Sequence, residues 1–179
     1  MVLNFDDITN LAEKIYPAIF VNNEIPIEVL CGQIFQESAG NTTAYRYDRN
    51  GGSSGLMQVD PGVSQSLGFG SVDLTDPETN VKIGFTYDLQ FYRGLEDNYN
   101  ILQLSDNKLK IAMSLVCYNC GPRNFNLMFE NHLSGTNWTW EDAIKNYSLV
   151  SNWQSCLNYP ELVFSKATRH FGWNGVIPQ

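Results

Sequence analysis

Three carboxylates, Glu37, Asp48 and Asp60, lie within one short stretch of the sequence, and their surroundings suit acid–base chemistry. Apolar residues recur at helical spacing along 27–34, after Pro26, and Glu37 continues that row. A carboxyl group on the core-facing side of a helix is partly desolvated, which favours its neutral form and raises its pKa. A side chain that keeps its proton near neutrality can act as a general acid. The sequence therefore predicts Glu37 as a proton donor, and rotation of its side chain into solvent is the alternative.

Three short motifs follow one another in the order ESAGN, GLMQVD and LVCYNCGPRNF. They resemble the signatures of the goose-type lysozymes and the soluble lytic transglycosylases, which cut the sugar backbone of peptidoglycan. The resemblance covers residues 26–171, and the loop YDRNGGSSGLMQVD is closer to the goose-type pattern because it keeps both aspartates. It implies a mainly α, lysozyme-like α+β fold. In that fold a helical bundle core and a small lobe of loops and short strands flank a glycan-binding cleft.

The resemblance implies a muramidase that cuts the β-1,4 bond between MurNAc and GlcNAc during cell-wall lysis, with Glu37 as the general acid. In an inverting hydrolase a second carboxylate activates water, and Asp48 and Asp60 are the candidates. A lytic transglycosylase needs no second carboxylate, because the 6-hydroxyl of the substrate closes a 1,6-anhydro ring. The presence of both aspartates favours hydrolysis over this alternative. A third hypothesis is an inactive glycan-binding or structural module of a phage tail or secretion apparatus.

Six further residues are candidates for substrate contact: Ser38, Tyr45, Met57, Gln58, Tyr118 and Asn119. The resemblance implies that the Tyr118 hydroxyl lies near the catalytic glutamate and that Asn119 contacts substrate. Tyr45 would stack on a sugar, and Met57 and Gln58 would line the groove. Each has a structural alternative, namely packing in the core or support of a loop.

The composition limits the possible partners. The 179 residues carry a net charge of −8, with 43% hydrophobic and 17% charged residues, as in a globular chain with one core. This acidic balance argues against nucleic acid, which needs a basic surface, and against electrostatic capture by an anionic lipid or wall. We expect a monomer with no cofactor, a single catalytic domain over 1–179, and a helical extension over 1–24.

The N-terminal segment MVLNFDD has acidic residues where a signal peptide has basic ones. No run of about 18 apolar residues occurs, so we expect no membrane insertion. We therefore expect a protein that stays in the cytoplasm until lysis releases it, or one carried by a virion or another assembly to the cell wall.

The four cysteines are Cys31, Cys117, Cys120 and Cys156. Cys117 and Cys120 form a CxxC, which is compatible with a metal or redox protein. A zinc site would need further ligands at matching spacing, so we expect no metal and free core thiols. A Cys31–Cys156 disulfide remains an alternative.

The spacing of apolar, capping and breaking residues predicts a series of helices and two short strands. The first helix is capped by Asp6 or Thr9 and is interrupted at Pro17. Strands are expected at Tyr45–Tyr47 and Leu56–Val59. The further predicted helices run from Pro26 to Gly40, from Asp60 to Leu67, from Asp76 to Tyr92, from Asp106 to Gly121, over 124–132 and 139–147, and from Pro160 onward.

Overall fold

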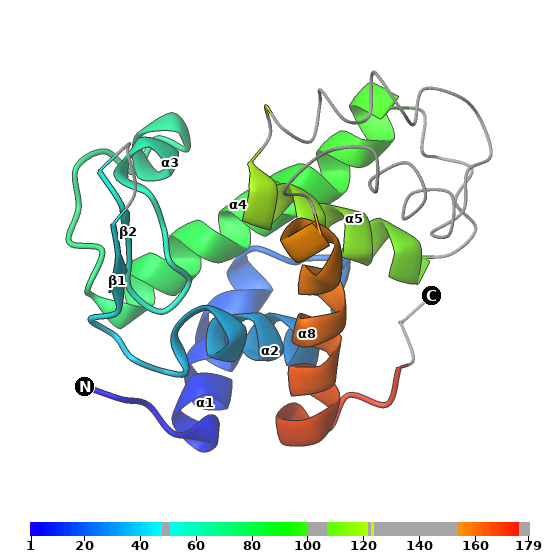
Figure 1. Cartoon of the computed structure of the whole chain (residues 1–179), viewed down its shortest axis with the longest axis horizontal. Helices are drawn as coiled ribbons and strands as arrows, with labels where there is room; N and C mark the ends of the chain where they lie inside the picture. The colour runs from blue at the N-terminus through cyan, green and yellow to red at the C-terminus, as the bar shows by residue number, and fades with distance from the viewer. Residues whose placement is uncertain (48–50, 100–106, 122, 124–153, 176–179) are drawn as a thin grey trace. The chain divides into compact units, whose positions relative to one another are not determined.

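The computed structural model describes residues 1–47, 51–99, 107–121, 123 and 154–175 (Figure 1). They fall into two compact units, Met1–Leu89 with Val163–Gln179, and Gln90–Leu162. Most of the described residues are helical and the two strands are short, which confirms the predicted fold class. The prediction of a single catalytic domain stays a prediction. Asp48 and the helices expected over 124–132 and 139–147 lie outside the described residues.

Helix α1 runs over Phe5–Ile15 and is capped by Asn4, two residues before the nearer candidate from the sequence, Asp6. The Asn4 side chain accepts a hydrogen bond from the Asp7 amide at 2.9 Å, and the Asp7 carboxylate accepts one from the Asn4 amide at 3.1 Å. This reciprocal capping box satisfies two amides, so the prediction of Asp6 or Thr9 as the cap is wrong. The interruption at Pro17 is confirmed, because a 3-10 helix over Tyr16–Ala18 follows α1 directly.

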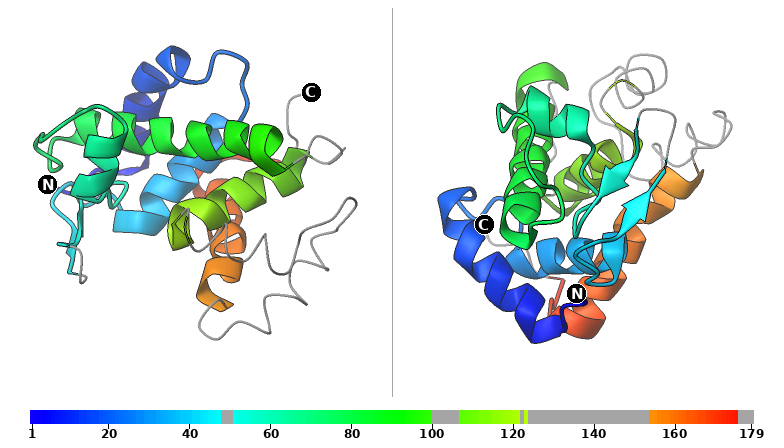
Figure 2. Two further views of the ribbon diagram at one scale, coloured as in Figure 1. Left: turned by 90° about the horizontal axis from the view of Figure 1, so that it is seen from above. Right: turned by 90° about the vertical axis from the view of Figure 1, so that its left-hand side faces the viewer.

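Helix α2, over Ile27–Ser38, crosses the first unit beside α1 (Figures 1 and 2). It ends at Ala39, whose φ of 51° is left-handed, and at Gly40, whose φ is 78°. The final part of α8 approaches α2 closely at Gly32. A Cβ at this glycine would lie 2.8 Å from the backbone of Val163 and 2.8 Å from that of Ala167. Gly32 therefore allows two helix backbones to pack almost in contact.

The small lobe of the first unit contains a two-stranded antiparallel hairpin. Strand β1, Tyr45–Arg46, pairs with β2, Ser53–Ser54, with Tyr45 opposite Ser54 (Figure 2). The first strand is near the predicted place, but the prediction of a second strand over Leu56–Val59 is wrong. Gly55 and Gln58 have φ angles of 80° and 48°, which are incompatible with extended backbone, so these residues form a turn. Helix α3, Pro61–Ser66, follows as predicted.

Helix α4, Pro77–Tyr99, begins after Asp76, whose carboxylate accepts a hydrogen bond from the Thr79 amide at 2.9 Å. The predicted start is confirmed, but the helix continues seven residues beyond the predicted end at Tyr92. Within the first unit its predicted inward face is buried, including Val81 and Leu89. This face places the start of α4 against the core and the turn that follows β2.

In the second unit, α5 covers Asn107–Cys120, and its predicted buried face is confirmed. Helix α8, Gln154–Phe171, has residues in both units. The prediction that Pro160 opens the last helix is wrong, because the helix begins six residues earlier and Pro160 lies inside it. The remainder of α8, from Val163, packs in the first unit, where the His170 ring stacks on Phe5 with centroids 4.5 Å apart. In the described part of the chain, no helix is long and apolar enough to cross a membrane.

Candidate active site

Glu37 occupies the last turn of α2 and is half-buried. The left-handed residues Ala39 and Gly40 turn the chain away directly after it, so the glutamate lies at the junction of the helix and the small lobe. The Ser38 hydroxyl donates to the Ile34 carbonyl at 3.1 Å, which supports this last turn. Glu37 is therefore partly desolvated at the end of its helix, and its role as a proton donor stays a prediction.

One turn before Glu37, Gln33 points into the core and is fully buried. Its Nε2 donates to Oδ1 of Asp88 on α4 at 3.2 Å, and Asp88 is also fully buried. Complete burial raises the pKa of Asp88 well above its usual range. The hydrogen bond from Gln33 lowers this pKa, whereas the charge of nearby Glu37 raises it further. The sequence prediction did not include Asp88. Its spacing of seven residues from Val81 places it on the apolar face of the predicted helix, and this pattern indicates a buried acidic side chain.

The turn after β2 is held by Asn80 of α4, which is 1% exposed. Its Oδ1 accepts from the Met57 amide at 2.7 Å, and its Nδ2 donates to the carbonyls of Ser54 and Leu74 at 2.8 and 2.9 Å. A Cβ at Gly55 would lie 2.3 Å from the Asn80 side chain, so only glycine fits there. Asn80 thus fixes the GLMQV turn on the scaffold, a role that the sequence analysis did not assign.

The side chains of Met57 and Gln58 also stabilise this turn. Met57 is completely buried, and a Cβ at Gly84 of α4 would lie 2.7 Å from its side chain. This is the core-packing role that the sequence left open beside substrate contact. Gln58 is half-buried, and its Nε2 donates to the carbonyls of Ala44 and Gly55 at 3.1 and 3.0 Å. Its amide therefore ties β1 to the turn.

Asp60 caps α3. Its Oδ1 accepts a hydrogen bond from the Gly62 amide at 2.6 Å, and its side chain is half-buried. A carboxylate at a helix N-terminus is stabilised by the unpaired amides and by the helix dipole. Asp60 thus has a structural task that explains its position without a catalytic one.

Tyr45 is 60% exposed, and its hydroxyl donates to the Gly51 carbonyl at 3.0 Å. It therefore braces the hairpin while most of the residue stays exposed. Tyr118 and Asn119 lie in the last turn of α5 in the second unit, and both are half-buried. Their predicted roles toward Glu37 and the substrate stay predictions.

The four cysteines are free thiols, and Cys31 and Cys117 are buried. Burial raises the pKa of Cys31 to about 12. In the second unit, a hydrogen bond between the Cys120 and Cys156 thiols lowers the pKa of Cys156 to about 7 and raises that of Cys120. Cys156 thus has Cys120 as its partner, in place of the Cys31 bridge that the sequence left open. Among the described residues, no group of three or more histidine, cysteine or acidic side chains is arranged to hold a metal ion.

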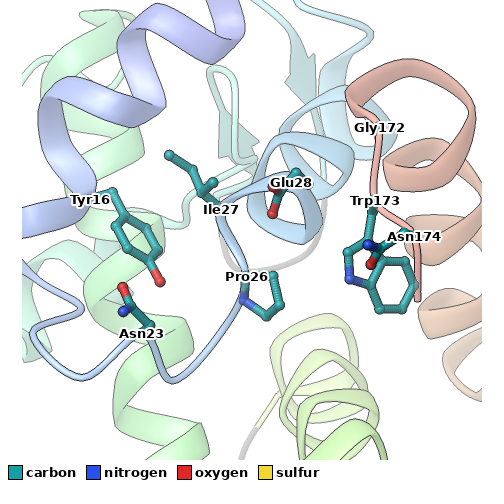
Figure 3. A pocket seen from close by; sticks show the side chains of 8 residues that line it. All are labelled: Tyr16, Asn23, Pro26, Ile27, Glu28, Gly172, Trp173 and Asn174. Atoms are coloured by element: carbon teal, nitrogen blue, oxygen red, sulfur yellow. The ribbon is translucent and has the colours of Figure 1, made fainter. Parts of the chain in front are cut away.

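A hollow of about 280 Å³ lies at the other end of α2 (Figure 3). Trp173 and Asn174, which follow α8, lie on one side of the helix start, and Tyr16 and Asn23 lie on the other. A helix rises about 1.5 Å per residue, so this hollow is roughly 14 Å along the axis from Glu37. It is therefore separate from the candidate active site.

A mostly helical fold with a short two-stranded hairpin is the architecture of the lysozyme-like class. Residues 20–140 match the transglycosylase SLT domain family, and the chain belongs to this family. The predicted resemblance to this family is thereby confirmed.

Among solved structures, the 70 kDa soluble lytic transglycosylase SLT70 from Escherichia coli has a similar fold, with a TM-score of 0.63 and 22% sequence identity. The match covers 93% of this chain and 25% of that protein, so the chain spans about a quarter of the length of its structural relative. None of the curated proteins matches the chain at a significant level.

Proposed function

We propose that this chain is a lytic transglycosylase that cleaves the β-1,4 bond between MurNAc and GlcNAc in peptidoglycan, with Glu37 as its acid and base. The observation that carries the proposal is the half-buried position of Glu37 in the last turn of α2, inside the region that matches the transglycosylase family. Asp60 supports it indirectly, because its carboxylate already caps α3.

The reaction follows from one carboxyl group. Protonated Glu37 donates its proton to the glycosidic oxygen while positive charge develops on the MurNAc ring, and the bond from the anomeric carbon to that oxygen breaks. The Glu37 carboxylate then accepts the proton of the MurNAc 6-hydroxyl as this oxygen bonds to the anomeric carbon. The products are a 1,6-anhydro-MurNAc end and a free GlcNAc hydroxyl, and Glu37 regains its proton.

Hydrolysis is the second candidate, because the presence of both Asp48 and Asp60 in the sequence favours it. It needs a carboxylate that activates water opposite Glu37, and inverting enzymes separate the two groups by about 6.5–9.5 Å. Asp60 is the candidate that lies among the described residues. Its half-buried carboxylate uses Oδ1 to accept the hydrogen bond from Gly62, and its second oxygen is the one that would activate water. Asp48 is the other candidate.

The two reactions leave different ends on the glycan. Digestion of purified peptidoglycan by the chain, followed by mass analysis, should yield anhydro-MurNAc ends if the proposal holds. Reducing MurNAc ends would establish the hydrolase. If Asp60→Asn alone lowered the rate by about 10² or more, the second-carboxylate mechanism would gain support, because a lost general base has an effect of that size.

Binding without cleavage by the unmodified chain would favour the inactive module.

We further propose that Tyr118 and Asn119 assist at the substrate. The expected result is a lower rate for Tyr118→Phe and weaker substrate binding for Asn119→Ala.

For the route to the wall, we propose release at lysis or transport as part of an assembly. Fractionation of cells or particles would test it.

A further inference from the structure

Two side-chain oxygens in the first unit are buried without a hydrogen-bond partner among the described residues, namely Oε1 of Gln33 and Oδ2 of Asp88. Both belong to the pair already joined by the 3.2 Å bond from Gln33 Nε2 to Asp88 Oδ1. An unpaired buried polar atom is costly, and two on one contact require an explanation.

The explanation lies in the protonation state of Asp88. An ionised carboxylate only accepts hydrogen bonds, and so does the amide oxygen of glutamine, so these two oxygens cannot satisfy each other. A proton on Asp88 Oδ2 converts one of the two acceptors into a donor. The Gln33 Nε2 then donates to Asp88 Oδ1, and the protonated Asp88 Oδ2 can donate to Gln33 Oε1, which gives a cyclic acid–amide pair.

We propose that Asp88 is a neutral, protonated carboxylic acid that pairs with Gln33 and acts as a positioning residue for Glu37. This inference rests on the proposed function only in taking Glu37 as the acid. Gln33 precedes Glu37 by one helical turn on the same face of α2, so a fixed Gln33 fixes the turn that carries Glu37. Because Asp88 belongs to α4, the pair anchors the catalytic turn to the scaffold helix.

The neutral state also suits the reaction. Glu37 must carry a negative charge between its acid step and its base step. A second buried negative charge nearby would disfavour that state, whereas a neutral acid does not. Burial and the neighbouring Glu37 both favour the protonated form of Asp88, in agreement with the hydrogen-bond argument.

The first test reads the proton directly. Infrared spectra of the chain with isotope-labelled aspartate, recorded near neutral pH, should contain the carbonyl band of a protonated carboxylic acid. Asp88→Asn should remove this band, and Glu37→Gln should leave it in place. Absence of the band from the unmodified chain overturns the proposal, whatever the activity of the chain.

The second test uses kinetics on peptidoglycan. Asp88→Leu leaves the Gln33 amide unpaired, and displacement of the catalytic turn should lower kcat by about tenfold or more, with KM within about twofold. Asp88→Asn keeps both hydrogen bonds without a charge and should restore kcat to within about threefold of the unmodified chain. Val81→Ala, on the same buried face of α4, is the control for lost packing alone.

Three outcomes overturn the positioning role: an unchanged kcat for Asp88→Leu, an Asn variant as impaired as the Leu variant, or an equal loss for Val81→Ala. If Asp88→Leu does not fold, the Asn variant and the infrared band still decide. Full activity of Glu37→Gln would refute the proposed function and not the protonation of Asp88, because the band does not depend on activity.

Discussion

The Asp88→Asn variant should become more stable relative to the unmodified chain as the pH rises. Asp88 is fully buried, and its folded pKa lies well above its usual value. Between the unfolded and the folded pKa, the folded chain therefore holds a proton that the unfolded chain has released. The contribution of this group to stability is fully present below the unfolded pKa and is lost as the pH rises toward the folded one. Asp88→Asn removes the titration from both states.

The size of the effect follows from the one proton involved. The free energy of unfolding of the Asn variant, relative to the unmodified chain, should rise by about 1.4 kcal/mol for each pH unit above about pH 4.5, until the folded pKa is reached. For a chain of 150–250 residues, about 1 kcal/mol shifts Tm by roughly 2–4 °C, so the gap in Tm should grow by several degrees per pH unit.

Urea unfolding of both proteins at several values between about pH 5 and pH 7 measures this difference directly. Val81→Ala, which removes buried volume from the same face of α4 and no titratable group, is the control, and its difference from the unmodified chain should not change with pH. A gap for Asp88→Asn that does not change with pH would refute the reasoning, because Asp88 would then be ionised in both states.

Three further predictions concern packing, the turn after β2 and the thiols. Gly32→Ala should lower the free energy of unfolding by about 1–3 kcal/mol in a denaturant titration, because its Cβ would meet the Ala167 backbone; a gain would contradict this packing. Asn80→Ala removes the three hydrogen bonds of this buried side chain and should cost about 3 kcal/mol or more by the same method; a loss below about 1 kcal/mol would show that the turn does not depend on them. Cys156 should be alkylated by iodoacetamide with a pH midpoint near its pKa of about 7, as followed by peptide mass mapping. Cys120→Ala should move that midpoint upward, and an unchanged midpoint would contradict the thiol–thiol contact.

The fold could be predicted from the sequence where local rules coincide with packing. The start of α4 after Asp76-Pro77, the short helix after Asp60 and the break at Pro17 all follow from capping residues and proline. The errors have two sources. At α1 a local capping box of Asn4 and Asp7 fixes the cap earlier than expected. At α8 Pro160 lies inside the helix although proline disfavours a helix interior.

The position of Glu37 on its helix was predictable, and the contacts around it were not. An acidic residue continues an apolar helical row, and α2 carries it in its last turn, while its role as the acid stays a prediction. The roles of Asn80 and Asp88 depend on partners 23 and 55 residues away in the sequence, Met57 and Gln33. Spacing within one helix carries no information on such long-range pairs.

The central claim is that Glu37 supplies the proton that breaks the glycan. Its most direct test is the release of anhydro-MurNAc ends from purified peptidoglycan by the unmodified chain and by Glu37→Gln, at equal concentration of folded protein. The glutamine variant keeps the size of the side chain and loses the acid, so its rate should fall by about 10²-fold or more. Release at the unmodified rate would contradict the account.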